Sequence, residues 1–155
     1  MCIRDRNRVD ADPNIGIMIE NASLYPELSG RENLRLLASI RKRATNEEID
    51  QAIRRVGLEP EDKRTFRKYS LGMKQKLGIA NAIMGEPDII VLDEPINALD
   101  EASVEQVKKV LVDLRERDHL IIIACHDREE LEYLSDEIIE IKDGTVVCKQ
   151  KEGVA

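Results

Sequence analysis

The chain has 155 residues, which is enough for one domain that buries a core. It carries 24 Lys and Arg against 31 Asp and Glu, a net charge of -7, so non-specific nucleic-acid binding, which needs a basic surface, is not expected. No apolar run approaches the length of a membrane-spanning helix. The three cysteines lack metal-ligand spacing, so we expect reduced thiols in a cytosolic protein.

The six N-terminal residues, MCIRDR, look foreign to the chain. They are the translation of ATG TGT ATA AGA GAC AG(N), which resembles read-through of a transposon-type sequencing adapter. We therefore interpret residues 1–6 as an artefact; an ordinary polar N-terminus is the alternative. On the first interpretation residues 7–155 are native and the true protein starts upstream.

The first half of the chain is predicted to be mostly helical after one short strand at residues 15–19. The S-x-x-E sequence of residues 29–32 has the form of a capping box and predicts a helix start. A second helix is predicted from about Asn46, with Gly57 at its C-terminal cap. The apolar faces are expected at Leu36, Leu37 and Ile40 in the first helix and at Ile49, Ala52, Ile53 and Val56 in the second.

A third helix is predicted to begin at Ser70 as its cap and to stop at Gly85. Its core positions are expected at Met73, Leu77, Ala80 and Met84. The region before it is locally basic, which we interpret as a solvated face rather than a nucleic-acid site. The basic residues are Arg54, Arg55, Lys63, Arg64, Arg67 and Lys68.

From residue 88 onward strands and helices alternate, which predicts an α/β domain. Buried strands are expected at residues 88–92 and 119–125. Helices are expected to start from the capping patterns of residues 103–106 and 127–130, with a hairpin around Asp143-Gly144. We divide the native chain into a helical part at about residues 21–85 and an α/β part at about 86–155.

Asp93 and Glu94 follow the first of these buried strands. Carboxylates at the carboxyl end of a parallel strand lie where α/β sheets bind ligands. Hydrolysis of a phosphoanhydride needs a hard cation and a positioned water. Asp93 suits Mg²⁺, and Glu94 suits a base that activates the water. The alternative is a simple cap beyond a buried strand.

The flanking residues resemble the nucleotide-binding domain of ABC-type ATPases in order and spacing. That family places a Leu-Ser-Gly-Gly-Gln signature before the Asp-Glu strand, a Leu-Asp "D-loop" after it, and a lone His after the next strand. The matching segments here are Tyr69-Ser70-Leu71-Gly72-Met73, Asn97-Ala98-Leu99-Asp100 and His126. The resemblance covers residues 15 to about 147.

The resemblance implies a partial P-loop NTPase domain of ABC type that binds ATP and Mg²⁺. Asp93 and Glu20 would be metal ligands, Glu94 the catalytic base and His126 a catalytic γ-phosphate contact. Nucleotide contacts would come from Ser70, Leu71, Gly72, Met73, Glu20 and Asp100. A second nucleotide-binding subunit and a transmembrane permease at the cytoplasmic face of the membrane would be partners, with no nucleic acid involved.

The chain departs from the family pattern in three places. Glu20 stands where the family usually has Gln, within a segment that resembles transporters for antibiotic-peptide export or immunity. Leu71 and Met73 replace the first Gly and the Gln of the signature. No G-x-x-x-x-G-K-[ST] loop occurs in the 155 residues, so we expect the chain alone to bind ATP poorly and not to turn it over.

Two alternatives to a transport ATPase stay open at this point. The first is a non-catalytic module that lends its signature segment to an intact partner subunit. The missing phosphate loop favours this alternative. The second is an ABC ATPase that does not take part in transport. Such proteins usually carry tandem domains or coiled-coil insertions, and neither is visible in the sequence.

Overall fold

The computed structural model describes residues 14–19, 24–41 and 44–151. Residues 1–6, interpreted as an artefact, and Glu20 lie outside these ranges. The described chain forms two compact units, a larger one that extends to Ala124 and a smaller one that starts at Cys125. Among the described residues, no helix combines the length and apolar character needed to cross a membrane.

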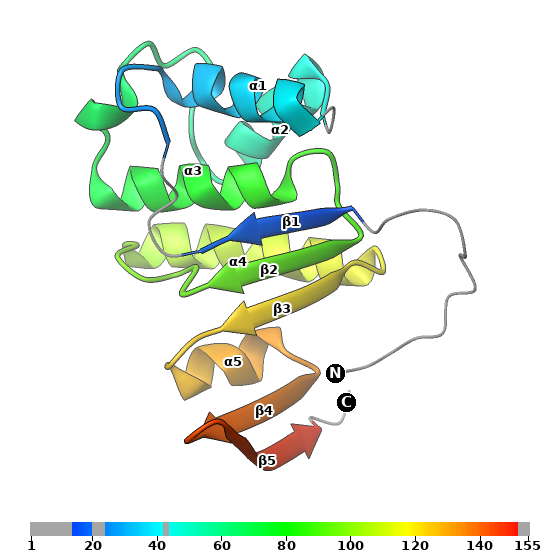
Figure 1. The fold of residues 1–155 in the computed structure, drawn as a ribbon. Helices are drawn as coiled ribbons and strands as arrows, with labels where there is room; N and C mark the ends of the chain where they lie inside the picture. The colour runs from blue at the N-terminus through cyan, green and yellow to red at the C-terminus, as the bar shows by residue number, and fades with distance from the viewer. Residues whose placement is uncertain (1–13, 20–23, 42–43, 152–155) are drawn as a thin grey trace. The chain divides into compact units, whose positions relative to one another are not determined.

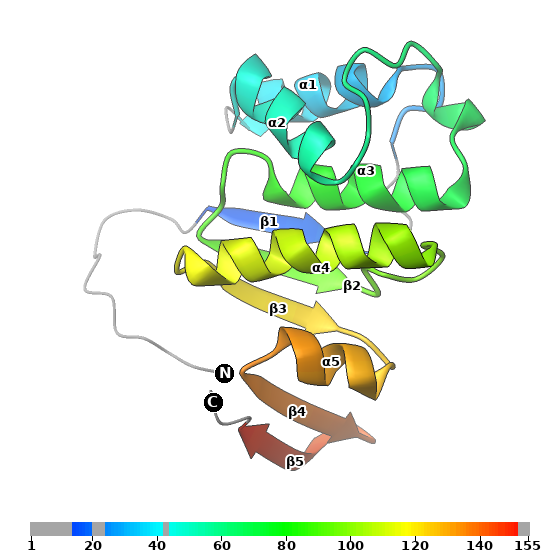
Figure 2. The ribbon, with the colours of Figure 1, turned by 180° about the vertical axis from the view of Figure 1, so that it is seen from behind.

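The larger unit is built on a three-stranded parallel sheet in the order β1-β2-β3 (Figure 1). Its strands are β1 (Ile15–Met18), β2 (Ile89–Asp93) and β3 (Leu120–Ala124). Two helices, α3 (Leu71–Ile83) and α4 (Glu101–Glu116), lie along one face of this sheet (Figure 2). This strand and helix arrangement confirms the predicted α/β class.

The core lies between this sheet face and the two helices. Ile90 and Leu92 of β2 point into it and are fully buried, which fixes the alternation along the strand. Gly16 of β1 is the place of closest approach, because a Cβ there would lie 1.8 Å from the carbonyl oxygen of Ala82 in α3. Burial of these apolar side chains holds the carboxyl end of β2 in place.

A helical region stacks on α3, formed by α1 (Gly30–Arg41), α2 (Asn46–Arg55) and a short 3₁₀ turn at Phe66–Lys68. The predicted core face of α2 is confirmed, since Ile49, Ala52, Ile53 and Val56 are all buried. The helix opens with a capping box between Thr45 and Glu48 and is followed by Gly57 at φ 75°.

The predicted core face of α1 is wrong. Leu34 and Ala38 face inward, whereas Leu36 and Leu37 are half-buried and Ile40 is 69% exposed. Helix α1 packs against α2, and its buried stripe holds Leu34 and Ala38, which are neighbours by the i, i+4 rule. Three apolar residues with compatible helical spacing did not mark the buried side.

The prediction that β3 is a buried strand is also wrong. Leu120 is 42% exposed and Ile122 is 50% exposed, while Ile121 and Ile123 are half-buried. β3 lies at the edge of the three-stranded sheet and receives α4 on one face. Its apolar run is therefore divided between a covered face and an open one.

Helix α4 starts two residues before the predicted cap at residues 103–106. Asp100 is its N-cap, and the backbone N–H of Ser103 donates to the Asp100 carboxylate at 2.8 Å. The core face of the helix is buried at Val107, Val110, Leu111 and Leu114, whereas Val104 is half-buried.

The smaller unit holds α5 (Arg128–Leu134) and an antiparallel hairpin of β4 (Glu137–Lys142) and β5 (Thr145–Lys151). Asp127 caps α5 through bonds from the backbone N–H groups of Glu129 and Glu130. The hairpin turn falls at Asp143-Gly144, both at positive φ, as the sequence predicts for a two-residue turn.

Candidate functional site

The carboxyl end of β2 carries the acidic pair. Asp93 is the last residue of the strand, is half-buried, and lies opposite Ala124 of β3 in the register. Glu94 follows at once and is also half-buried. The two carboxylates therefore lie at the carboxyl end of the sheet, where parallel α/β sheets bind ligands, as expected from the apolar strand before them.

The backbone of Glu94 has an unusual conformation, with φ at 48°. Its N–H donates to the carbonyl oxygen of Ala124 at 2.8 Å. Its carbonyl oxygen accepts from the side-chain amide of Gln75 at 2.6 Å and from the N–H of Asn97 at 3.2 Å. Three hydrogen bonds thus define where the chain turns after the strand. Sequence reasoning missed Gln75, although it lies one helical turn after Gly72, on the same face of α3.

The signature segment opens α3. Ser70 is the N-cap, with its hydroxyl oxygen accepting from the N–H of Met73 at 3.2 Å. Leu71 is 64% exposed, and Gly72 and Met73 are half-buried. The first N–H groups of a helix have no partner within the helix and carry the positive end of its dipole, so this end of α3 suits an anion such as a phosphate.

The signature segment and the turn after β2 touch each other. A Cβ placed on Gly72 would lie 3.1 Å from the carbonyl oxygen of Ala98, and only glycine gives such a close approach without displacing the turn. Ala98 has φ 62°, a second left-handed residue in this turn after Glu94. The structure thus brings Ser70, Gly72 and the Asp93-Glu94 pair into one region.

Asp100, which the resemblance gives as a nucleotide contact, is the N-cap of α4. Its carboxylate caps α4, and the hydrogen bonds from Ser103 hold the pKa of Asp100 below its ordinary value. The residue as a whole is exposed.

His126 lies in the smaller unit, two residues after the end of β3, and is exposed. Glu20 lies outside the described residues. Because His126 belongs to the smaller unit and Glu20 is not described, their roles beside Asp93 and Glu94 stay predictions. His119 has a structural contact instead, since its Nδ1 lies 2.8 Å from the carbonyl oxygen of Pro87.

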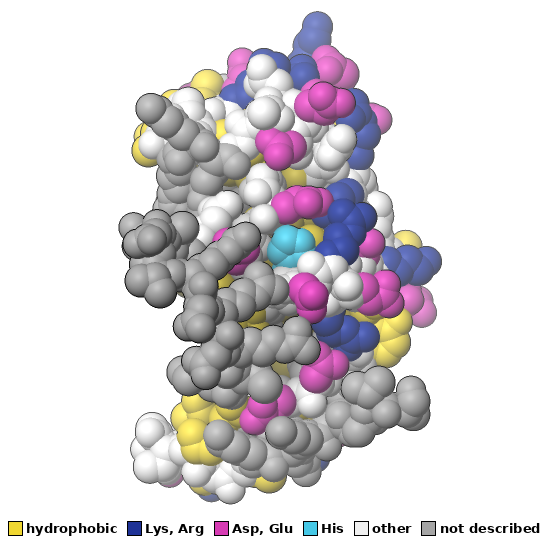
Figure 3. All heavy atoms as spheres, turned by 90° about the vertical axis from the view of Figure 1, so that its right-hand side faces the viewer, with side chains coloured by type: hydrophobic (Ala, Val, Ile, Leu, Met, Phe, Trp, Pro, Cys, Tyr) yellow, Lys and Arg dark blue, Asp and Glu magenta, His cyan; other side chains and the backbone are white. Residues whose placement is uncertain are grey.

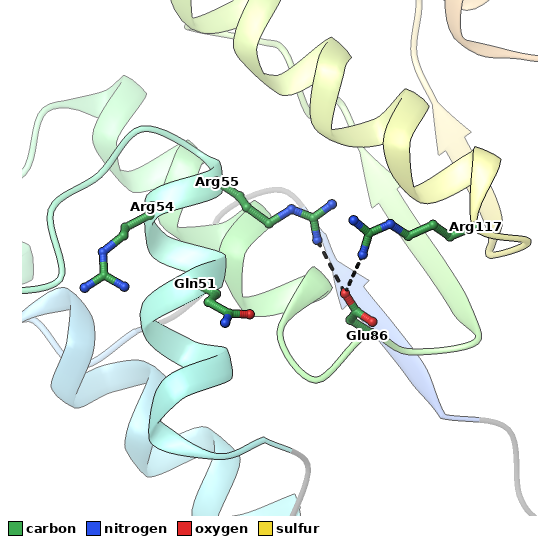
Figure 4. Close-up of a pocket in the computed structure, with 5 residues that line it drawn as sticks. All are labelled: Gln51, Arg54, Arg55, Glu86 and Arg117. Carbon is green, nitrogen blue, oxygen red and sulfur yellow. Dashed lines mark hydrogen bonds and ion pairs between the residues drawn. The ribbon is translucent and has the colours of Figure 1, made fainter.

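A hollow of about 380 Å³ lies elsewhere in the larger unit, lined by Gln51, Arg54, Arg55, Glu86 and Arg117 (Figure 4). Arg55 and Arg117 approach the Glu86 carboxylate to 3.9 and 3.1 Å, and both also pair with Asp113. Arg55 and Arg117 are therefore each paired with two carboxylates. On the face drawn in Figure 3, Lys and Arg side chains lie beside Asp and Glu rather than in one basic patch.

The profile of the ABC transporter family matches residues 2–97, which is more than half of the chain. The chain belongs to the ABC transporter family.

Curated ABC proteins support this membership. ABC transporter ATP-binding protein YybJ of Bacillus subtilis (strain 168) is 41% identical over 89% of this chain and 63% of its own length. Bacitracin transport ATP-binding protein BcrA of Enterococcus faecalis is 40% identical over 86% of this chain and 44% of its own. Lantibiotic transport ATP-binding protein SrtF of Streptococcus pyogenes is 32% identical over 88% and 59%. The chain thus spans less than two thirds of the length of each of these relatives.

The fold is also that of an ABC cassette. The dimeric structure of the ATP-binding cassette MJ0796 in a post-hydrolysis state, bound to ADP and Pi, matches with a TM-score of 0.81 at 24% identity. The match covers 92% of this chain and 65% of that one. It confirms the predicted fold, a partial P-loop NTPase domain of ABC type.

Proposed function

We propose that the protein containing this chain is the ATP-hydrolysing subunit of an ABC transporter. It would act as a dimer at the cytoplasmic face of the membrane and drive a separate transmembrane permease. The observation that carries the proposal is the Asp93-Glu94 pair at the carboxyl end of β2, in one region with the capped N-terminus of α3. Because the chain belongs to the ABC transporter family, we interpret this arrangement as a nucleotide site.

The described residues suit Mg²⁺ and ATP. Asp93 offers the hard carboxylate oxygen that Mg²⁺ prefers, and Glu20 would be a second ligand. Bound Mg²⁺ would neutralise charge on the β and γ oxygens of the nucleotide. Ser70, Leu71, Gly72 and Met73 would present the helix N-terminus to a phosphate held by the second subunit.

Glu94 would orient the attacking water and take its proton. His126 would donate a hydrogen bond to the γ-phosphate, and the exposed Asp100 would contact the second subunit. These roles rest on the family pattern at the matching positions, with Glu20 and His126 assigned from the sequence.

The transported molecules would be antibiotic peptides, handled for export or for immunity. The relatives named for bacitracin and lantibiotic transport support this class. The residues around Glu20 and up to the start of α1 support it as well, because they resemble that subgroup in sequence.

No G-x-x-x-x-G-K-[ST] loop occurs in the 155 residues, so the proposal assigns that part of the site to sequence outside them. The second candidate is a non-catalytic partner module, which the missing loop favours. Sequencing the source DNA upstream of the Asn7 codon separates the two. An in-frame strand, phosphate loop and helix support the ATPase, and a genuine start codon without them supports the module.

The decisive assay compares ATP turnover of the longer protein with that of Glu94→Gln. We expect Glu94→Gln to lose turnover and to accumulate an ATP-bound dimer in size-exclusion chromatography. Glu116→Gln is the matched control, because it makes the same change at the exposed end of α4. Turnover that survives Glu94→Gln would overturn the catalytic assignment. The 155-residue chain alone is expected to show no turnover.

A further inference from the structure

Gln75 of α3 contacts the proposed base, Glu94, but has no role in the mechanism proposed above. Its side-chain amide donates to the carbonyl oxygen of Glu94 at 2.6 Å, across 19 residues of sequence. The bond is partly buried, so water competes with it less than at the surface. It joins the second turn of α3 to the backbone of the residue assigned as the base.

Glu94 needs such a contact because of its backbone conformation. A φ of 48° places it in the left-handed region, which a side-chain-bearing residue occupies at a cost. Such a conformation persists only where surrounding contacts hold it. The chain direction at Glu94 determines where its side chain leaves the backbone, so the same contacts determine where the carboxylate can reach.

A second contact comes from the same face of α3. Gly72 lies one turn before Gln75, and its missing side chain lets Ala98, also at positive φ, approach closely. The helix thus holds the turn at both ends, through a hydrogen bond at Glu94 and a close contact at Ala98. A bond from the N–H of Asn97 to the Glu94 carbonyl oxygen closes the turn between them.

We propose that Gln75 is a positioning residue for Glu94: its amide holds the Glu94 backbone in the left-handed conformation that aims the carboxylate at the attacking water. This rests on the proposed ATPase function. A Gln suits the position because its amide is a donor of the right length on a helix face. A carboxylate of the same size could only accept, and would face the carbonyl oxygen without a hydrogen between them.

Four variants of the longer ATPase test the proposal. In Gln75→Ala and Gln75→Glu, kcat should fall by about 10- to 100-fold with KM for Mg-ATP nearly unchanged, since a misplaced base slows chemistry rather than binding. Gln75→Lys keeps a donor of similar reach and should recover most of the loss. Gln106→Ala is the control, because Gln106 makes the same amide-to-carbonyl bond, to Arg55 at 3.2 Å, away from this turn. Its kcat should not change.

The outcomes overturn the proposal in two ways. If Gln75→Ala lowers kcat no more than Gln106→Ala, or if the loss lies in KM, Gln75 is a structural residue only. If Gln75→Glu keeps full kcat, the donated hydrogen bond is not what matters.

A second measurement works on the 155-residue chain and does not need turnover. Hydrogen exchange of the Glu94 amide, which is bonded to Ala124, should become about tenfold faster in Gln75→Ala, while the amide of Leu92 keeps its rate. An unchanged Glu94 rate would refute the role of Gln75. If the ATPase proposal alone is wrong, the longer wild-type protein shows no ATP turnover that the Glu94→Gln substitution could remove.

Discussion

Ser70 has two roles in the proposed site, and two substitutions separate them. Its hydroxyl oxygen accepts from the N–H of Met73 and so caps α3. The same side chain is assigned as a phosphate contact. Ser70→Ala removes both roles. Ser70→Asp keeps the cap, since Asp is as good an N-cap as Ser, but places a negative charge where the phosphate would bind.

The magnitude of the cap follows from its geometry. Loss of a Ser N-cap costs about 1 kcal/mol, with a range of roughly 0.5–2. The bond to Met73 is 3.2 Å long and Ser70 is exposed, so we place Ser70→Ala at about 0.5–1 kcal/mol of unfolding free energy. For a chain of this size that corresponds to a shift of about 1–4 °C in Tm. Ser70→Asp should stay within about 0.5 kcal/mol of wild type.

The assays are urea unfolding followed by circular dichroism on the 155-residue chain and ATP-dependent dimer formation in the longer protein. Ser70→Ala should lose stability, and Ser70→Asp should keep it while losing dimer formation. If Ser70→Asp destabilises the fold as much as Ser70→Ala does, the hydroxyl is not acting as a helix cap. If Ser70→Asp still forms the ATP-dependent dimer, this end of α3 does not meet a phosphate.

Four further outcomes are expected from the fold. Gly16→Ala should destabilise by about 3 kcal/mol or more in urea unfolding, because its Cβ would overlap the backbone of α3. Asp100→Ala should cost about 1 kcal/mol and Asp100→Asn much less, since only Asn keeps the cap on α4. Hydrogen bonds from Thr45 lower the pKa of Glu48 in the folded protein. The stability that these bonds contribute is therefore full above the ordinary pKa of 4.5 and is lost as pH falls through the lower folded-state pKa. A series of unfolding curves at different pH values measures this loss. Ile122→Lys should reduce self-association in light scattering while changing stability little, because Ile122 is half exposed on the open sheet face.

Local signals in the sequence were sufficient where one neighbour decides the structure. Ser70 as a cap, Gly57 after α2 and the turn at Asp143-Gly144 were all predicted, because each depends on its own backbone geometry. The strand before Asp93 was predicted for a similar reason, since a wholly apolar run bounded by turns is typical of a buried parallel strand.

Elements whose burial depends on distant partners were predicted less well. α1, which packs against α2, carries more apolar residues than it buries, and its buried stripe holds Leu34 and Ala38. β3 looks buried from its composition, yet Ile122 lies on the face that α4 does not cover. The contact of Gln75 could not be predicted for the same reason. Its sequence position on a helix does not indicate that its amide bonds to a left-handed residue 19 positions later.

Helix α3 links the parts of the proposed site that the sequence lists separately. Ser70 and Gln75 are five residues apart, about 7.5 Å along the helix axis, so the N-terminal end of α3 and the bond to Glu94 belong to one rigid piece. Farther along, Gly78 rests on Met18 of β1, where a Cβ would meet the sulfur at 3.4 Å. A shift of this helix by a few tenths of an ångström would therefore be felt at both β1 and Glu94, because close-packed contacts transmit displacement rather than absorb it. For this reason the proposed nucleotide contact at Ser70 and the position of Glu94, the proposed base, are not independent in this fold.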